Sequence, residues 1–255
     1  MKNDLFSIGP FTVHGYGLMI AIGVLSAYYM VEYRAKKKQM DWEKVFPLTV
    51  WSVLGGFLGS KILYLLTRLP DILANPALLG SSIKDGFVVY GGIIGGILTA
   101  WIYCKCTKWN FLKIFDIAMP AVAMAQGFGR IGCLLAGCCY GKETDSILAI
   151  TFHESEFAPN NVPLIPTEIY SSLLDFVHFG VLLFIAGRKK KDGQVAACYL
   201  LFYSIGRFIL EFFRGDLIRG SVGVLSTSQF ISLFIGVAGI LILILRSREN
   251  PGRHS

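Results

Sequence analysis

Three cations of this chain stand inside long apolar stretches, where charge is costly. Lys61, Arg130 and Arg207 each fall within such a stretch. A Lys or Arg near the centre of a membrane helix costs about 2.5 to 3.5 kcal/mol on insertion scales, so these residues usually face the interior of a helical bundle. A guanidinium offers planar, bidentate hydrogen bonds to phosphate and keeps its charge when partly dehydrated. The residues therefore predict an arginine-lined site that suits a phosphate-bearing lipid.

Acidic and further basic residues accompany these cations. Glu211 and Arg214 follow Arg207 by four and seven residues, a spacing that places all three on one helix face. Glu211 would orient an arginine there, and a structural ion pair is an equally good interpretation. The other acidic residues in predicted spans are Asp116, Glu168 and Asp175. For Lys61, Asp116 and Asp175 a structural role, as an internal ion pair or a side chain reaching the interface, is favoured.

Glycines gather around the cations. Small residues at four-residue spacing let membrane helices approach closely, and this packing role is expected for Gly55, Gly56 and Gly59 and for Gly91, Gly92, Gly95 and Gly96. The run from Gly127 to Gly141 around Arg130 is too rich in glycine for an uninterrupted helix. We expect a helix end or break beside a polar pocket, because loosened backbone at membrane depth needs protein or water around it.

Composition identifies the class of protein. Of the 255 residues, 54% are hydrophobic and 16% are charged, whereas soluble domains carry about 25% charged residues; the mean hydropathy is +0.57. Apolar stretches recur near the roughly 20 residues that cross a bilayer as a helix. The predicted fold is all-α, a polytopic membrane bundle in a single domain, 1–255. The seven expected spans are 13–32, 46–66, 87–104, 113–135, 168–187, 195–213 and 224–245. The first is expected to be retained, because the N-terminus does not resemble a cleaved signal peptide.

Charge at the span ends predicts orientation. Fifteen of the 24 Lys and Arg residues follow spans one, three, five and seven, against six at the other ends. The six are Lys2, Arg68, Lys84, Lys142, Arg214 and Arg219. By the positive-inside rule the N-terminus lies outside and the C-terminus is cytoplasmic. The net charge of +7 then reflects topology and attraction to lipid headgroups, and no nucleic-acid partner is expected. Residues 140–167 form an extracytoplasmic segment, interpreted either as a small cap over a substrate entrance or as a solvated loop.

Several motifs, in order along the chain, resemble the prolipoprotein diacylglyceryl transferase family of bacteria. The stretch from Gly129 to Gly141 resembles the family signature, which runs Gly-Arg-x-Gly-Asn and closes on a glycine. The remaining matching segments are Phe11–Met19, Asp85–Gly92, Pro166–Tyr170, Arg207–Arg214 and Leu225–Gln229. The resemblance covers nearly the whole chain. It implies an inner-membrane enzyme that moves the diacylglyceryl group of phosphatidylglycerol to the lipobox cysteine of a preprolipoprotein, forming a thioether and releasing glycerol phosphate.

The resemblance also implies roles for residues. Arg130 and Arg207 are expected to be catalytic and to bind the phosphate, with Tyr16, Cys133, Gly141, Glu211 and Arg214 beside the phosphatidylglycerol. The signal peptide of the preprolipoprotein is the second substrate, membrane lipids surround the chain, and no cofactor is expected. Two positions depart from the family pattern: Tyr90 replaces the His of its His-Gly-Gly segment, and Cys133 replaces the signature Asn.

The substrate thiol attacks well only as a thiolate, so its proton needs an acceptor. Tyr90 is a poor base unless an arginine depresses its pKa, because an unperturbed tyrosine has a pKa near 10. His14 in span one is a second candidate, although a histidine satisfied at the interface is favoured there. A third alternative is that the arginines alone stabilise the thiolate.

The chain has six cysteines, Cys104, Cys106, Cys133, Cys138, Cys139 and Cys198. Zinc sites normally show spaced Cys pairs and His ligands, so no metal is expected at Cys133, Cys138 and Cys139. The sequence leaves open whether these three pair. Two other classes of function remain as alternatives: a lipid-binding relative with altered activity, and an anion transporter, which would show inverted repeats that the sequence lacks.

Overall fold

The computed structural model describes residues 4–8, 11–84, 86–189, 191–216 and 220–248. Within them seven helices are long and apolar enough to cross a membrane. They span Gly15–Lys37, Trp42–Thr67, Val89–Cys106, Phe111–Ala136, Thr167–Arg188, Gln194–Phe213 and Thr227–Arg246. The seven predicted spans are thus confirmed to within a few residues. Among the residues used to predict orientation and motifs, Lys2, Asp85, Lys190, Arg219 and Arg253 lie outside the described residues, and the orientation itself stays a prediction.

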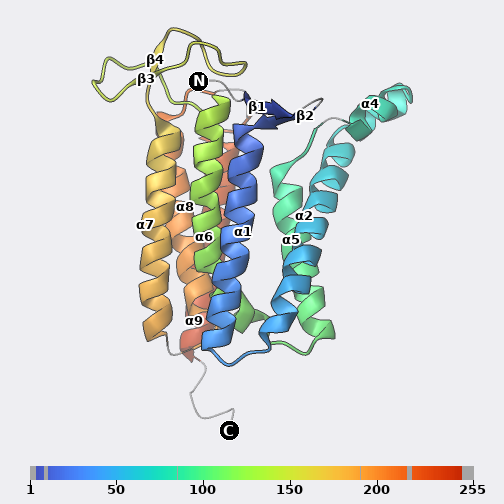
Figure 1. Cartoon of the computed structure of the whole chain (residues 1–255), viewed down its shortest axis with the longest axis vertical. Helices are drawn as coiled ribbons and strands as arrows, with labels where there is room; N and C mark the ends of the chain where they lie inside the picture. Colours follow the sequence, from blue (N-terminus) through green and yellow to red (C-terminus); the bar gives the residue numbers. More distant parts are fainter. Residues whose placement is uncertain (1–3, 9–10, 85, 190, 217–219, 249–255) are drawn as a thin grey trace. The chain divides into compact units, whose positions relative to one another are not determined.

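The chain divides into two compact units, of which one comprises residues 32–114. Its core is the antiparallel pair α2 (Val45–Thr67) and α5 (Val89–Cys106), preceded by the 3₁₀ turn η1 (Trp42–Lys44). The short helices α3 (Leu69–Ala74) and α4 (Leu78–Lys84) lie at one end of this pair (Figure 1).

The predicted glycine packing is confirmed between α2 and α5. A Cβ atom on Gly56 would lie 3.3 Å from the carbonyl oxygen of Gly92, and one on Gly59 would collide with the backbone of Gly91. Because neither helix carries a side chain at these positions, the two backbones approach closely.

Lys61 has a structural role in the same unit. Its Nζ donates to the carbonyl oxygens of Gly86 at 2.9 Å and Ser82 at 3.3 Å, and it lies 4.2 Å from the ring centroid of Phe87. These contacts hold the segment between α4 and α5 against α2, in agreement with the favoured interpretation.

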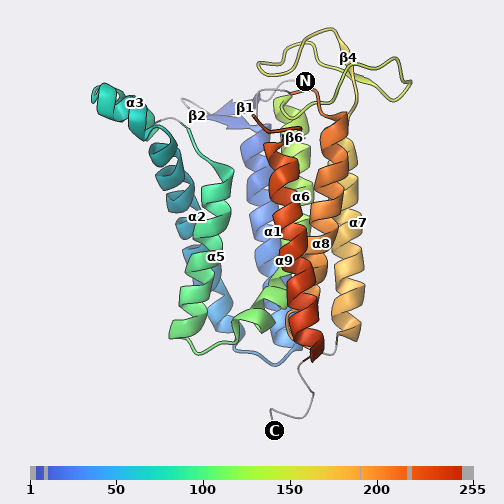
Figure 2. The same ribbon diagram turned by 180° about the vertical axis from the view of Figure 1, so that it is seen from behind.

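The other unit comprises residues 1–31 and 115–255. It contains most of α1 (Gly15–Lys37) and α6 (Phe111–Ala136), and all of α7 (Thr167–Arg188), α8 (Gln194–Leu210) and α9 (Thr227–Arg248). These helices run side by side (Figures 1 and 2). A 3₁₀ turn, η2 (Glu211–Phe213), extends α8. Three two-stranded pairs complete the unit: β1 (Asp4–Ile8) with β2 (Phe11–His14), β3 (Ile150–Thr151) with β4 (Pro163–Leu164), and β5 (Ser221–Val222) with β6 (Leu225–Ser226).

Asp116 on α6 anchors the start of α8. It is fully buried, and its carboxylate accepts hydrogen bonds from Nζ of Lys189 at 2.6 Å and from the backbone N–H groups of Gly193 at 2.8 Å and Ala196 at 2.9 Å. A buried carboxylate needs this number of partners to offset the loss of water. Asp116 is therefore structural, as the sequence favoured.

The helix end expected within the glycine run 127–141 is confirmed, and it falls after the first three glycines of the run. Helix α6 continues through Gly127, Gly129 and Gly132 and ends at Ala136, after which Gly137 takes a positive φ of 68°. Gly127 packs under the ring of Phe176, where a Cβ atom would lie 2.9 Å from the ring carbon Cζ. Glycine lowers the stability of a helix in water. In a membrane this cost is smaller than the cost of backbone N–H and C=O groups left without hydrogen bonds, so the helix continues through the glycines.

Residues 140–167 form an ordered segment at the end of the bundle where α7 begins (Figure 1). Phe152, Ala158 and Leu164 are buried together there and contact Leu134 of α6. The Oγ atom of Ser155 donates to the carbonyl oxygen of Gly137 at 3.2 Å. The segment thus has a small apolar core of its own and is attached to the end of α6.

Candidate functional site

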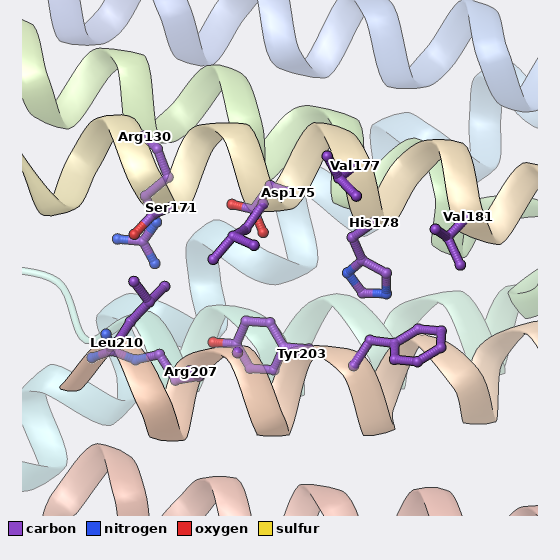
Figure 3. Close-up of a pocket in the computed structure, with 12 residues that line it drawn as sticks. Arg130, Ser171, Asp175, Val177, His178, Val181, Tyr203, Arg207 and Leu210 are labelled. Carbon is purple, nitrogen blue, oxygen red and sulfur yellow. The ribbon is translucent and has the colours of Figure 1, made fainter. Parts of the chain in front are cut away.

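A pocket of about 290 Å³ lies between α6, α7 and α8 (Figure 3). Arg130 of α6 and Arg207 of α8 both line it, so the structure brings the two predicted arginines to one cavity. Each stands six residues before the end of its span, at Ala136 and Phe213, which corresponds to a depth of about 9 Å along a helix. The arginines therefore lie within the membrane helices, each between the centre and one end of its span.

The pocket is polar at one end and apolar at the other. Figure 3 shows Arg130, Ser171 and Arg207 at one end, and Val181 further along α7. Leu174, Val177 and Phe202 add apolar surface. A cavity of this kind fits an amphipathic molecule with an anionic group at the arginine end.

Arg207 is held on two sides. Its Nη2 lies 2.9 Å from Oε2 of Glu211 and donates to Oγ of Ser228 on α9 at 2.8 Å. The predicted pairing of Arg207 with Glu211 is therefore present. Ser228 lies in the matching segment Leu225–Gln229 but carries no charge, so the sequence did not indicate it as a partner of Arg207.

Arg214 approaches Glu211, but not from the predicted face of a continuous helix. Helix α8 ends at Leu210, and η2 turns the chain so that Nε of Arg214 lies 4.0 Å from Oε2 of Glu211. The main partner of Arg214 is Asp216, through bonds of 2.8 and 2.6 Å. Burial lowers the pKa of Arg214, but the bonds to Asp216 and Cys139 outweigh it and raise the pKa above its ordinary value, so the side chain stays charged.

Asp175 and His178 on α7 also line the pocket. Asp175 interacts electrostatically with Arg130, which lines the same pocket. The His178 side chain is about nine-tenths buried, stacks on Tyr199 with ring centroids 5.2 Å apart, and has no hydrogen-bond partner at Nε2 within the described residues. No motif indicated His178. The available signal was simply an ionisable residue inside an apolar span.

The end of α6 carries the other residues expected beside the lipid. Tyr16 of α1 packs on Gly132, where a Cβ atom would lie 3.2 Å from its ring, and interacts electrostatically with Arg130 and Cys133. Gly141 is buried, and a Cβ atom there would lie 2.5 Å from the carbonyl oxygen of Ile165. Gly141 thus lets the segment after α6 pack against the residues that precede α7.

Cys133, Cys138 and Cys139 form a cluster in which all three Sγ atoms lie within 4.8 Å of one another. None of the six cysteines, all of which are described, forms a disulfide. Hydrogen bonds with Cys133 and Cys139, together with burial, raise the pKa of the Cys138 thiol. The cluster lies near Arg130, which interacts electrostatically with Cys133 and Cys139.

Neither candidate for the proton acceptor is among the residues that line the pocket. His14 ends β2, just before α1, with its side chain 55% exposed and Nδ1 2.6 Å from Oδ1 of Asp4, and it is not among the residues that line the pocket. Tyr90 is the second residue of α5, in the unit of residues 32–114, and is partly exposed. The roles of both residues remain predictions.

Seven apolar helices with an arginine-lined pocket among them define a multi-pass membrane protein. The family model described as prolipoprotein diacylglyceryl transferase matches residues 3–245. The chain belongs to this family, so the membership predicted from its motifs is confirmed, and it is a transferase.

Curated relatives resemble the chain over most of their length. A phosphatidylglycerol–prolipoprotein diacylglyceryl transferase of Clostridium tetani is 46% identical over 242 residues, which cover 95% of this chain and 96% of the relative. A second, numbered 2, from Clostridium perfringens is 46% identical over 255 residues and 99% of both chains. The Staphylococcus carnosus enzyme of the same name is 31% identical over 246 residues, covering 94% of this chain and 89% of the relative.

Proposed function

We propose that the chain transfers the diacylglyceryl group of phosphatidylglycerol to the lipobox cysteine thiol of a preprolipoprotein. The names of the relatives support the lipid donor and the protein acceptor. The observation that carries the site assignment is that Arg130 and Arg207 line one pocket. We place the protein in the cytoplasmic (inner) membrane, with the N-terminus outside and residues 140–167 as a cap over the substrate entrance.

The reaction is a displacement at carbon. The acceptor sulfur attacks the glyceryl CH₂ carbon that carries the phosphate, a C–S bond forms, and the C–O bond to phosphate breaks. The bonding electron pair leaves with glycerol phosphate, whose added negative charge must be stabilised. Two guanidiniums in a mostly apolar cavity suit that task, because preorganised charges act strongly where water is excluded.

The other pocket residues have supporting roles in this proposal. Glu211 and Ser228 position Arg207. Asp175, beside Arg130, limits the net positive charge at the arginine end. His178, in the tautomer with hydrogen on Nε2, has a donor free to meet an ester carbonyl of the lipid. The apolar end then accepts the start of an acyl chain.

Complementation in cells depleted of their own transferase tests the proposal. The wild-type chain is expected to restore lipoprotein maturation, while R130A and R207A are not. R68A is the matched control, because Arg68 is half-exposed and pairs with Asp71 at 3.0 Å in the other unit. Failure of the wild type despite normal membrane insertion would refute the transferase activity and favour a lipid-binding protein. Normal maturation with R130A or R207A would refute the site.

A further inference from the structure

The turn after α6 gathers three thiols within a stretch of seven residues. Cys133 lies in the last turn of α6, and Cys138 and Cys139 follow Gly137. The backbone N–H of Cys138 donates to the carbonyl oxygen of Cys133 at 3.0 Å, which folds the chain back over the helix end. The three Sγ atoms consequently lie within 4.8 Å of one another.

The backbone of this turn is constrained in a way that favours the cluster. Gly137 has a φ of 68°, and Cys139 has a φ of 67°, a left-handed conformation that non-glycine residues rarely adopt. The Oγ1 atom of Thr167 donates to the carbonyl oxygen of Cys139 at 2.9 Å and helps to hold it there. Strained backbone held by its neighbours is concentrated at functional sites.

The spacing of the sulfurs suits a thiophilic cation. Zinc binds thiolate sulfur at about 2.3 Å, which for tetrahedral geometry places the sulfurs roughly 3.8 Å apart. The cluster needs only a small contraction to reach that spacing. All three cysteines are partly exposed, so an ion and one further ligand have access to them.

The charges around the cluster suit an anionic complex. Three thiolates on a divalent cation carry a net charge of −1. Arg214 hydrogen-bonds to Cys139, and Arg130 interacts electrostatically with Cys133 and Cys139. Metal binding releases the thiol protons and creates a negatively charged complex. The two arginine side chains near the cluster offset this charge.

We propose that Cys133, Cys138 and Cys139 bind one Zn²⁺ ion as thiolates and leave its fourth position open for the acceptor thiol of the substrate. The first half of the proposal, zinc binding by the three cysteines, depends on the cluster alone. The second half, coordination of the substrate thiol at the open position, rests on the proposed function. Zinc sites with three protein ligands and an open position are typical of catalysis, whereas structural sites are closed by four.

The open position solves the proton problem of the transfer. A thiol that coordinates zinc is deprotonated, and its proton passes to water at the exposed side of the cluster. The zinc-bound sulfur then forms the C–S bond while the C–O bond to phosphate breaks, as described above. The resulting thioether carries no charge and is a weaker ligand, so it can leave. No general base is needed, and neither Tyr90 nor His14 has to serve as one.

Metal binding by the full-length protein in detergent tests the first half without any measurement of activity. After reduction and removal of metal, the wild type is expected to bind one Zn²⁺ per chain. With Co²⁺ as the probe it is expected to show the intense absorption of cobalt–thiolate charge transfer. C133S, C138S and C139S should each lose most of the affinity, at least tenfold. The matched control replaces the other three cysteines, C104S/C106S/C198S, and should bind as the wild type does.

Two results would overturn the site. One is wild-type protein that remains folded and binds no stoichiometric metal. The Co²⁺ spectrum of the wild type alone shows this result, so it does not depend on whether a variant folds. The other is zinc affinity unchanged in all three cluster variants. A disulfide between Cys133 and either neighbour in protein purified without reductant, with no metal binding after reduction, would likewise refute it.

A lipobox peptide added to the Co²⁺ form tests the second half. The absorption is expected to gain intensity with a cysteine peptide and to stay unchanged with its serine counterpart. If both peptides leave the spectrum unchanged, or if the metal-free enzyme transfers the lipid group at the wild-type rate, the substrate-thiol role is refuted. If the metal and peptide bind but no lipid group is transferred, the proposed function fails and the metal site stands.

Discussion

Nη2 of Arg207 lies 2.9 Å from Oε2 of Glu211, one helical turn further along the chain. Both side chains are almost buried, at 11% and 10% exposed. The carboxylate therefore fixes the direction of the guanidinium at the polar end of the pocket. An arginine already held in place loses less conformational entropy when it binds a phosphate.

Replacing Glu211 by Gln tests this positioning. E211Q keeps the shape of the side chain and removes its charge. The Arg207 side chain should therefore remain in the pocket, but the direction of its guanidinium should no longer be fixed. The KM for phosphatidylglycerol is expected to rise roughly tenfold, with a smaller change in kcat, because one charge-assisted contact of about 1.5 kcal/mol is weakened. Steady-state kinetics in mixed micelles measures this split. E43Q, at an exposed position, is the control, and an unchanged KM in E211Q would contradict the role.

Lysine replacements test the need for a planar guanidinium. R130K and R207K preserve charge but lose bidentate bonding. Loss of one such donor to a developing anion is expected to lower kcat by about 10². R68K should show the wild-type rate. If both pocket variants keep full activity, charge alone suffices and the phosphate geometry proposed here is wrong.

His178 offers a test of where the lipid lies. H178F keeps a ring for stacking on Tyr199 and removes the polar Nε2 atom. Loss of one neutral hydrogen bond of about 1 kcal/mol should raise the KM for phosphatidylglycerol roughly fivefold, with no loss of thermal stability. Tryptophan fluorescence or calorimetry measures the affinity of the wild type and of H178F for the lipid. Equal affinity would show that no lipid atom meets Nε2.

Asp116 supports the fold rather than the chemistry. D116A removes the partner of Lys189 and of two backbone N–H groups, so we expect a loss of about 3 to 5 kcal/mol of stability and a matching fall in Tm. D192N is the control, because Asp192 bonds the same lysine but is 35% exposed.

The pH dependence of that loss has a definite sign. Burial lowers the pKa of Lys189, but its bonds to Asp116 and Asp192 outweigh burial and raise the pKa above the ordinary 10.5. A raised pKa in the folded state means that the stabilisation is complete below the ordinary value and disappears only above it. The difference in Tm between wild type and D116A should therefore stay constant from pH 7 to 9. A difference that shrinks across that range would contradict the charged pair.

Gly141 and Gly180 form a matched pair for close packing. A Cβ atom on Gly141 would lie 2.5 Å from the oxygen of Ile165, whereas one on Gly180 in α7 meets nothing within 4 Å. G141A should cost about 1 to 3 kcal/mol through overpacking, while G180A should be neutral or slightly stabilising. Thermal unfolding of both variants gives the comparison, and equal Tm values would mean that the segment after α6 adapts freely.

The spans were predictable because hydrocarbon imposes a single rule, that about 20 apolar residues must cross as a helix. Arg130 and Arg207 were predictable for the same reason, because a charged side chain inside such a stretch is energetically costly and usually serves a functional site. Glu211, on the same chain segment as Arg207, was also predictable as its partner, but the partners from other helices were not. Ser228 and Asp175 come from other helices, and helix packing that is not encoded by sequence spacing decides which side chains meet.

The thiol cluster shows a second limit of sequence. The spacing of Cys133, Cys138 and Cys139 lacks the paired pattern of zinc sites, and no metal was expected. A glycine and a cysteine with positive φ close the turn, and that conformation brings the three sulfurs together. The helix end within the glycine run was predicted, and the glycines before it stay helical because helix propensities measured in water underrate a helix in lipid.

Transfer in a purified system tests the central claim most directly. The full-length protein would be supplied with phosphatidylglycerol labelled in its headgroup glycerol and with a lipobox peptide. The account predicts one labelled glycerol phosphate released for each peptide that gains a diacylglyceryl thioether, and formation of both products about 10² slower with R130K or R207K. Folded wild-type protein that yields neither product, or pocket variants that yield both at the wild-type rate, would contradict it.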